Sequence, residues 1–330
     1  MFEVIANAIK DYAPNAWVIN YTNPMTLCVK TLYRVFPEIK AFGCCHEVFG
    51  TQDVLAKMAS VLFNEDVKRK EIKVNPIGVN HFTWLTKATY RNIDLFPYYR
   101  QFCEKYKDGC TEYVDPEWLK GFHGNAHKVK IDLFRNFGYI AAAGDRHLAE
   151  FCPNNWYLGS PENVKEWGFG LTSVDWRKND LKERLAKSAR LVSGEQEFEF
   201  KPTGEEGVRQ IKALLGLDDF VTNVNVPNVG QIPNLPLGSV VESNARFCAD
   251  TVIPVMAGDV PTAVHGLLST IVDNQDMVVE AAANRDLELA FKAFCKDPQN
   301  TFSLEDSRKL FKEMIENTKK YLDGYNVENF

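Results

Sequence analysis

Three short peptides carry the side chains most suited to metal and sugar chemistry. They are Asn20-Tyr21-Thr22-Asn23-Pro24-Met25, Gly43-Cys44-Cys45-His46 and Ile77-Gly78-Val79-Asn80-His81-Phe82-Thr83-Trp84. Each has the pattern of a short β-strand that ends in polar or metal-binding residues, and open α/β sheets bind ligands at the carboxyl ends of strands. Together they supply a thiolate, an imidazole and side-chain amides, which suit a borderline divalent metal beside a polyol better than a hydrophobic core.

Cys45 and His81 are the candidate metal ligands within these peptides. Successive strand residues point to opposite faces, so at most one of Cys44 and Cys45 can face a given site. The spacing alone is weak evidence, because buried free cysteines are common in cores. A histidine at a strand end is also commonly an ordinary polar group with a hydrogen-bond partner. On spacing alone, both the metal and the structural interpretation stay open.

The amides of Asn23 and Asn80 differ in how easily a structural role explains them. Asn23 followed by Pro24 is typical of a helix N-cap and first helical position. Asn80 is harder to explain as a cap, because the residues after it continue as a strand.

The peptide Ala143-Gly144-Asp145-Arg146-His147-Leu148-Ala149-Glu150-Phe151 allows two interpretations. In the structural one, Asp145 caps a helix and Arg146 pairs with Glu150 four residues later. In the functional one, Asp145 is a base and the Arg146 guanidinium binds a substrate carboxylate through two parallel hydrogen bonds. Tyr139, shortly upstream, is an alternative base.

The elements that position these residues follow from periodicity and turn residues. We predict helices and strands that alternate as in a doubly wound α/β sheet, then a helix-rich remainder with a β excursion. The predicted ranges are helix Phe2–Tyr12, strand Trp17–Tyr21, a helix from Asn23 and Pro24 to about Val35, strand Ile39–Cys44, helix Val48–Phe63, strands Ile72–Val79 and Phe82–Tyr90, strands Phe220–Asn228 and Ser239–Phe247, and long helices Pro261–Cys295 and Leu304–Leu322. The peptide Val229-Gly230-Gln231-Ile232-Pro233-Asn234-Leu235-Pro236 is either a binding loop or a rigid connector, and its prolines favour the connector.

Composition excludes several classes of partner. The chain has 330 residues and a net charge of −6, and no basic stripe that would favour nucleic acid occurs in it. No apolar run reaches membrane-spanning length, and the first residues lack the order of a signal peptide. Eight cysteines without a disulfide-scaffold pattern predict free thiols in a reducing cytoplasm.

The peptides quoted above, in this order, resemble glycoside hydrolase family 4, the NAD- and divalent-metal-dependent glycosidases. The resemblance covers essentially the whole chain, and its ordered set of motifs is specific although each motif alone is weak. The peptide around Asp145 is most similar to the α-galacturonidase-like branch, with the α-galactosidase-like branch second. The resemblance implies an α/β fold in which the carboxyl-terminal part of a Rossmann-like doubly wound sheet precedes a larger α+β catalytic and oligomerisation domain.

The resemblance also implies roles for particular residues. The metal, Mn²⁺ or a similar divalent ion, would be held by Cys45 and His81. The substrate-binding residues would be Asn23, His46, Asn80 and Arg146, with Asn23 also on the cofactor side. The base would be Asp145 or, as second choice, Tyr139.

The implied reaction differs from hydrolysis by two carboxylates. NAD removes a hydride from C3 of the sugar, a base removes the C2 proton, and the glycosidic oxygen leaves by elimination. Water then adds and the hydride returns, while a metal stabilises the enediolate as a Lewis acid. The substrate would be an α-galacturonide or an α-galactoside in a small sugar or oligosaccharide, and the protein a homodimer or homotetramer.

The main departure from the family concerns NAD. A Gly-x-Gly-x-x-Gly turn is absent from the sequence, so we expect the pyrophosphate-binding segment to precede Met1. Residues 1–46 would then be a remnant of the NAD-binding domain, and residues 47–330 the carboxyl-terminal catalytic domain. Two alternatives remain open here. One is a 2-hydroxy-acid dehydrogenase of the lactate/malate type, and the other is a non-catalytic truncated remnant.

Overall fold

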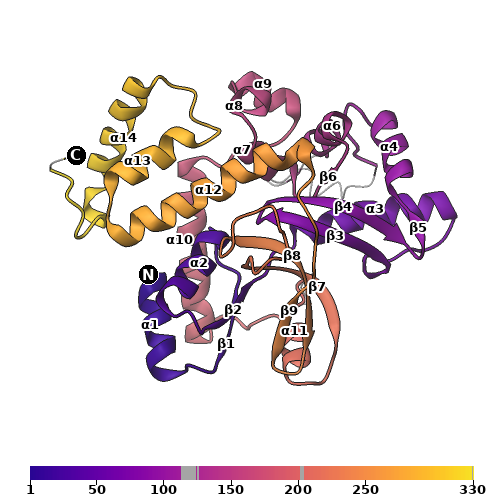
Figure 1. Ribbon diagram of the computed structural model, residues 1–330, viewed down its shortest axis with the longest axis horizontal. Helices are drawn as coiled ribbons and strands as arrows, with labels where there is room; N and C mark the ends of the chain where they lie inside the picture. Colours follow the sequence, from indigo (N-terminus) through magenta and orange to yellow (C-terminus); the bar gives the residue numbers. More distant parts are fainter. Residues whose placement is uncertain (113–123, 125, 201–203, 329) are drawn as a thin grey trace.

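One nine-stranded mixed sheet runs through the computed structural model, with helices packed around it (Figure 1). The structure describes residues 1–330 except 113–123, 125, 201–203 and 329. The strands follow the order β1-β2-β7-β8-β3-β4-β5, while β6 pairs with β4 and β9 with β8. Strands from the first ninety residues and from residues 220–254 therefore share one sheet.

The strands are β1 (Trp17–Asn20), β2 (Lys40–Gly43), β3 (Ile72–Val79), β4 (Phe82–Tyr90), β5 (Ile93–Asp94), β6 (Ile140–Ala141), β7 (Phe220–Pro227), β8 (Val240–Cys248) and β9 (Thr251–Pro254). The α-helices are α1 (Phe2–Tyr12), α2 (Met25–Val35), α3 (Glu47–Phe63), α4 (Phe96–Lys105), α6 (Lys128–Phe137), α7 (Asp145–Phe151), α8 (Asn154–Tyr157), α9 (Pro161–Trp167), α10 (Val174–Ser193), α11 (Gly207–Leu214), α12 (Thr262–Asn284), α13 (Leu287–Lys296) and α14 (Leu304–Thr318). Two short 3₁₀ helices are η1 (Arg69–Glu71) and η2 (Lys319–Tyr321).

The first part of the chain has the predicted alternation of helix and strand. β1 and β2 pair in parallel, and α1 packs on α2 through a small core that includes Ala6, Leu32 and Phe36. The other strand pairs within the described residues are antiparallel. The predicted fold class, a doubly wound start followed by an α+β region, is confirmed.

β3 and β4 form the hairpin that was predicted around Asn80 and His81. Val79 pairs with Phe82, so Asn80 and His81 form the two-residue turn, and His81 has a left-handed φ of 65°. Gly78 has φ of 152°, and a Cβ there would lie 2.5 Å from the carbonyl oxygen of Phe82. Only glycine fits that position, and the turn it permits presents the His81 side chain at the end of the hairpin.

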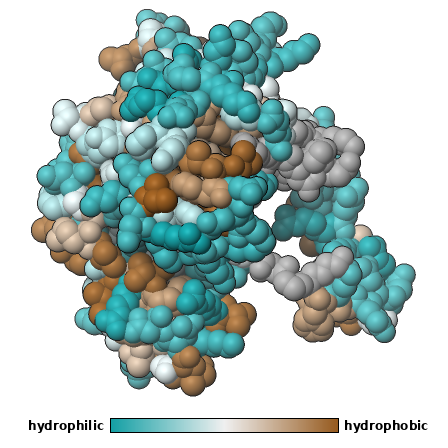
Figure 2. Space-filling model, turned by 90° about the vertical axis from the view of Figure 1, so that its right-hand side faces the viewer, coloured by the Kyte–Doolittle hydropathy of each residue, from teal (hydrophilic) through white to brown (hydrophobic). Residues whose placement is uncertain are grey.

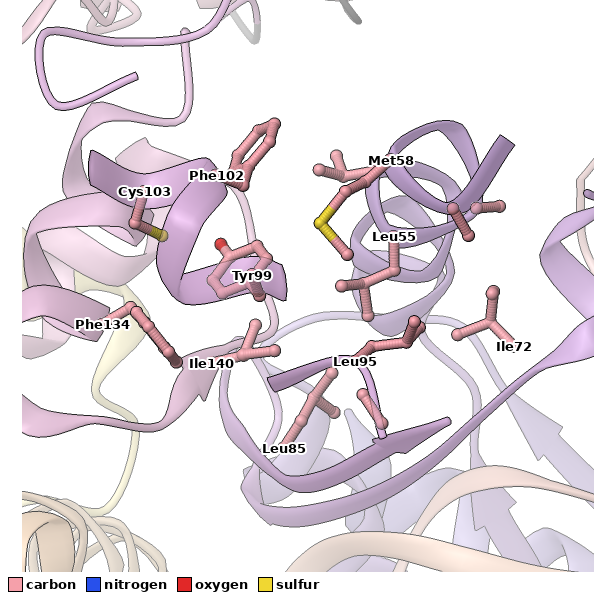
Figure 3. Packing of buried hydrophobic residues seen from close by; sticks show 14 of the residues in the cluster. Leu55, Met58, Ile72, Leu85, Leu95, Tyr99, Phe102, Cys103, Phe134 and Ile140 are labelled. Carbon is pink, nitrogen blue, oxygen red and sulfur yellow. The ribbon is translucent and has the colours of Figure 1, made fainter. Parts of the chain in front are cut away.

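Helices α3, α4 and α6 cover this hairpin through a buried apolar cluster (Figure 3). Leu55 and Met58 of α3 face Tyr99 of α4 and Leu85 of β4 across the cluster, and all four are buried. Burying side chains of this size contributes roughly 1.5–3 kcal/mol each. The cluster fixes the amino-terminal ends of α3 and α6 relative to the hairpin, and the candidate site lies beside these ends.

Three expectations about helix ends are wrong. The helix predicted over Pro261–Cys295 is two helices, α12 and α13, because Arg285 adopts a left-handed φ of 54° and the Asp286 carboxylate caps α13 at Leu289 N. The helix predicted to Leu322 ends as α-helix at Thr318 and continues only as η2. Helix α2 begins one residue later than predicted, with Pro24 before its first turn.

Two further expectations concern the chain as a whole. All eight cysteines are free thiols, as predicted. Among the residues that the structure describes, no helix combines the length and apolar character needed to cross a membrane.

Candidate active site

Three side chains that can bind a metal converge from three separate elements. Glu47 is the first residue of α3, His81 is the turn residue between β3 and β4, and His147 lies in α7. One ligand atom from each lies within 4.8 Å of the others. We call these three residues the Glu-His-His cluster.

Direct contacts hold the cluster in place. The rings of His81 and His147 stack with centroids 4.1 Å apart and planes inclined by 25°. Glu47 Oε1 lies 3.6 Å from His147 Nε2, and the Gly144 N–H donates to Glu47 Oε2 at 2.7 Å. Because Gly144 immediately precedes α7, this last bond ties the start of α7 to the start of α3.

The environment shifts the pKa values of the three groups in different directions. Burial acts to lower the pKa of His147, but the carboxylates of Glu150 and Glu47 outweigh it, so that the net pKa is raised. Burial and the neighbouring His147 lower the pKa of His81 to about 4. Burial acts to raise the pKa of Glu47, but the two histidines and the Gly144 N–H outweigh it, so that the net pKa is lowered. Near neutral pH the cluster therefore offers a neutral imidazole and a carboxylate, which are the forms that bind metal ions.

The Cys45 side chain is buried and lies two residues before Glu47 in the chain. Burial raises the pKa of its thiol well above the usual range, and the nearby Glu242 carboxyl acts in the same direction. The Asn223 amide donates to the Cys45 carbonyl oxygen at 3.3 Å and to Glu242 Oε1 at 2.8 Å. The Thr83 hydroxyl also donates to Glu242, so this buried acid links β4, β7 and β8 next to the Cys45 loop.

The structure thus places His81, which the sequence predicted as a metal ligand, together with two residues that we did not predict. Glu47 directly follows the Cys45-His46 step, and His147 lies in the peptide from which only Asp145 and Arg146 were selected. A sequence signal for His147 was its position three residues before Glu150, because residues at that spacing on a helix are neighbours. In the structure the two side chains approach to 3.7 Å. Cys45 lies outside the three-residue cluster.

Arg146 forms the expected ion pair on its own helix and leaves one donor atom without a partner. Its Nε lies 3.5 Å from Glu150 Oε1, which is the predicted i,i+4 pair, and its Nη2 donates to Thr172 Oγ1 at 3.0 Å. Its Nη1 is buried and has no hydrogen-bond partner. The amide nitrogen of Asn80 is likewise buried, and the Asn80 side chain lies beside the Cys45 thiol, whose pKa it acts to lower. Buried donors of this kind are costly unless a ligand satisfies them.

The two candidate bases occupy different surroundings. Asp145 is fully buried, and its Oδ1 accepts from the Lys130 N–H at 3.1 Å. Asp145 therefore caps α6. The structural interpretation had expected it to cap the helix in its own peptide, α7, and that expectation is wrong. Its Oδ2 has no partner, and burial raises the pKa of the carboxyl to about 6. Tyr139 is partly buried and packs against the apolar cluster that also contains Phe82.

The remaining predicted substrate-binding residues, Asn23 and His46, are exposed and lie in the segments that follow β1 and β2. His46 precedes α3, and its Nδ1 lies 2.9 Å from Glu205 Oε1. Asn23 is exposed, and its Oδ1 accepts from the Met25 N–H at 3.2 Å. Asn234 exchanges hydrogen bonds with Val260 at the approach to α12, so the loop around Asn234 is anchored to the fold.

Comparison with known proteins identifies the family. Residues 76–300 match the family 4 glycosyl hydrolase C-terminal domain, and residues 1–61 match family 4 glycosyl hydrolase. The chain belongs to family 4 of the glycosyl hydrolases. It is 58% identical over 330 residues to a protein of Thermoanaerobacterium saccharolyticum named alpha-galacturonidase, and the match covers 99% of this chain and 71% of that one.

Solved family 4 structures share this fold. The crystal structure of Bacillus subtilis lplD is 47% identical, with a TM-score of 0.89, and the match covers 95% of this chain and 71% of lplD. A 6-phospho-alpha-glucosidase from gut microorganisms, in complex with NAD and Mn²⁺, is 21% identical with a TM-score of 0.72 over 97% of this chain and 70% of that one. Membership of family 4 decides against the lactate/malate-type dehydrogenase alternative.

The donor set of the family 4 site suits a divalent metal. Two imidazoles and one carboxylate are ligands that first-row divalent ions accept, and carboxylate oxygen in particular suits Mn²⁺. A thiol as close in sequence as Cys45 could complete the set, because a bound cation deprotonates a coordinating thiol. By contrast, the sequence has no glycine-rich turn from strand to helix, so these residues offer no pyrophosphate cradle of that kind for NAD.

Proposed function

We propose that the protein is an NAD- and metal-dependent glycosidase that hydrolyses α-galacturonides, with α-galactosides as the second candidate. Family membership supports the glycosidase class, and the name of the 58% identical relative supports the uronide. Within the chain, the observation that carries the proposal is the buried, unpartnered Nη1 of the partly buried Arg146, which is adjacent to His147 of the cluster. A neutral sugar has no group that would balance a buried guanidinium donor equally well.

Arg146 is the proposed receptor of the sugar carboxylate. Glu150 and Thr172 engage two of its nitrogens and fix the plane of the guanidinium, while Nη1 stays available to an acceptor. A charge-assisted hydrogen bond to a carboxylate is roughly twice as strong as a neutral one. Because Arg146 and His147 are adjacent on α7, a carboxylate bound by Arg146 places its sugar ring near the cluster.

The proposed metal ligands are His81 and Cys45, extended by Glu47 and His147. A divalent ion such as Mn²⁺ bound there would act as a Lewis acid on the sugar hydroxyl oxygens. Asn80, next to His81, donates from its buried amide nitrogen to a sugar oxygen in this proposal.

Asp145 is the proposed base, and Tyr139 is the alternative. The Lys130 N–H fixes one oxygen of Asp145, the other oxygen is unpartnered, and a pKa of about 6 is close to that of an efficient general base at neutral pH. Asn23 and His46 are proposed to contact substrate from the exposed side, with Asn23 nearest to the cofactor.

The test compares matched α-galacturonide and α-galactoside substrates with wild type and Arg146→Lys, in the presence of NAD and Mn²⁺. Lysine keeps the charge but loses the planar arrangement of donors, so kcat/KM should fall at least about tenfold for the galacturonide and much less for the galactoside. Arg177→Lys is the matched control, because Arg177 donates to the same Thr172 hydroxyl at 3.2 Å from the exposed helix α10.

Two outcomes would contradict the proposal. A wild-type preference for the galactoside, or an equal loss on both substrates in Arg146→Lys, would remove the uronide assignment. Absence of turnover on both substrates in wild type would favour the non-catalytic alternative. A homodimeric or homotetrameric assembly, a cytoplasmic location and a division near residue 46 stay proposals that go with this function.

A further inference from the structure

A cavity of about 500 Å³ lies between the start of β3, the start of β7 and helices α3 and α11. Its volume is in the range of sites that hold small molecules. The elements β3 to β5 lie on the right of Figure 1, and Figure 2, which views the molecule from that side, shows a face where hydrophilic residues predominate. Among the described residues that line the cavity, none belongs to the proposed active site.

The cavity and the Glu-His-His cluster lie toward opposite ends of β3. Lys73, the second residue of β3, lines the cavity, whereas His81 lies beyond the last residue of that strand. Six strand residues separate Lys73 from Val79, which is roughly 20 Å at 3.3 Å per residue. The inner wall includes Asn223, whose amide donates to the Cys45 carbonyl oxygen at 3.3 Å. The cavity is therefore a separate site, one wall of which contacts the Cys45 loop.

Aromatic rings and a carboxylate fix two arginines in the lining. The Arg69 guanidinium lies 4.1 Å from the centre of the Phe49 ring, and its Nη2 donates to Glu206 Oε1 at 3.2 Å. The Arg209 guanidinium lies 4.0 Å from the centre of the Phe220 ring. Arginines that stack on rings in this way are already ordered, so binding of an anion costs them little side-chain entropy.

The positive charge that is not balanced within the cavity comes from two lysines. Four of the lining residues are basic and one is acidic. The carboxylates of Glu206 and Asp218 pair with the two arginines. Neither Lys70 nor Lys73 forms an ion pair with a residue that the structure describes, and Lys73 Nζ donates to the Lys70 carbonyl oxygen at 2.9 Å. The lysines are therefore available to an anionic ligand.

A buried acceptor in the same cavity calls for a ligand that also donates hydrogen bonds. The Glu206 side chain is only 9% exposed, and Arg69 engages its Oε1. Its Oε2 is buried and has no hydrogen-bond partner. A buried carboxylate oxygen without a donor is costly. A hydroxyl group would satisfy it, whereas an anion without a hydroxyl would not.

We propose that this cavity binds an anionic polyol, a sugar that carries a carboxylate or a phosphoryl group. Lys70 and Lys73 receive the anionic group, and Glu206 Oε2 accepts a hydrogen bond from a sugar hydroxyl. Uronates and sugar phosphates share this chemistry, so the test must separate them. The inference does not rest on the proposed glycosidase function, because the cavity uses other residues.

The test is calorimetric titration of the full 330-residue chain, without NAD or metal, with galacturonate, galactose 6-phosphate, galactose and inorganic phosphate. Arg146→Lys is the background, so that the carboxylate receptor proposed for the active site is weakened. This chain should bind one or both acidic sugars at least about tenfold more tightly than galactose. Lys70→Gln combined with Lys73→Gln should raise that Kd at least about tenfold. Lys178→Gln with Lys187→Gln, an equal charge change at exposed positions of α10, is the matched control and should change it little.

Tighter binding of galacturonate would identify a uronate site, and tighter binding of galactose 6-phosphate a sugar-phosphate site. Equal Kd values for the lysine pair and the control pair would overturn the proposal, as would the absence of binding of both acidic sugars. Inorganic phosphate that binds as tightly as the acidic sugars would overturn the role of the hydroxyl. Binding that occurs in wild type and disappears in Arg146→Lys would leave the proposed function intact and remove the second site. If thermal denaturation shows that the lysine pair does not fold, Lys73→Gln alone decides.

Discussion

Replacing Glu47 by glutamine tests the Glu-His-His cluster most directly. Glutamine has nearly the same size and keeps a carbonyl oxygen that can accept the Gly144 N–H, which now bonds to Glu47 Oε2 at 2.7 Å. The link between α3 and α7 should therefore survive, while the negative charge is lost. Removing a group that only supports a metal ligand already costs 10–100-fold in affinity. We expect loss of a direct ligand to cost at least about a hundredfold, or about 2.8 kcal/mol.

The assay is calorimetric titration of the purified chain with Mn²⁺, which needs neither NAD nor substrate. Glu71→Gln is the control, because the Glu71 carboxylate also accepts a backbone N–H, that of Lys68 at 2.9 Å. Glu71 is exposed and precedes the first residue of β3, whereas His81 follows the last residue of that strand. His147→Ala should weaken Mn²⁺ as Glu47→Gln does.

An unchanged Mn²⁺ affinity in both Glu47→Gln and His147→Ala would refute the cluster as a metal site. If Cys45→Ala and His81→Ala then abolished binding, the metal would be held only by the pair that the sequence resemblance implies. If all four variants lost binding while Glu71→Gln did not, Cys45 and the cluster would belong to one site.

Two further predictions concern the base and the hairpin. Asp145→Asn should lower kcat by about 10²–10⁴-fold. Thermal stability should fall little, since asparagine can still accept the Lys130 N–H. If only Tyr139→Phe caused a loss of kcat of this size, Tyr139 would be the base. Gly78→Ala should destabilise the protein by about 2–4 kcal/mol in chemical denaturation, because its Cβ would meet the Phe82 carbonyl oxygen in a strained backbone conformation. Gly266→Ala in α12, where a Cβ meets nothing within 4 Å, should be neutral or stabilising, and equal effects of the two substitutions would contradict the account of the turn.

Local patterns predicted the hairpin and the first helices well. The alternation in Ile72–Val79 and Phe82–Tyr90 fixes which residues are buried, and the two residues left between them can only form a tight turn. His81 was therefore placed correctly by short-range rules. The division between α12 and α13 was missed because Asn284, Arg285 and Asp286 are polar residues that a helix tolerates, and only the left-handed Arg285 breaks the helix.

The composition of the cluster depends on contacts that local patterns do not encode. Gly43 pairs with Asn225 on β7, and Gly78 pairs with Glu242 on β8, so two strands from residues 220–248 separate β2 from β3 in the sheet. The strand-end rule applied to these peptides describes open α/β sheets, whereas β3 is antiparallel to its neighbours. Which side chain beside Cys45 meets His81 is decided by this long-range register, and it selects Glu47.

The peptide around Asp145 shows why the two interpretations of its residues could not be separated in advance. The structural interpretation requires Arg146 to pair with Glu150, and the pair forms, yet Nη1 stays buried without a partner. Asp145 acts as a helix cap through Oδ1, yet Oδ2 stays unpartnered in a setting that raises the pKa of the carboxyl. Side chains with several hydrogen-bonding atoms can hold the fold with one and leave another for a ligand. A structural role at such positions is therefore no argument against a functional one, because the atoms that fix the side chain also aim the atom that remains.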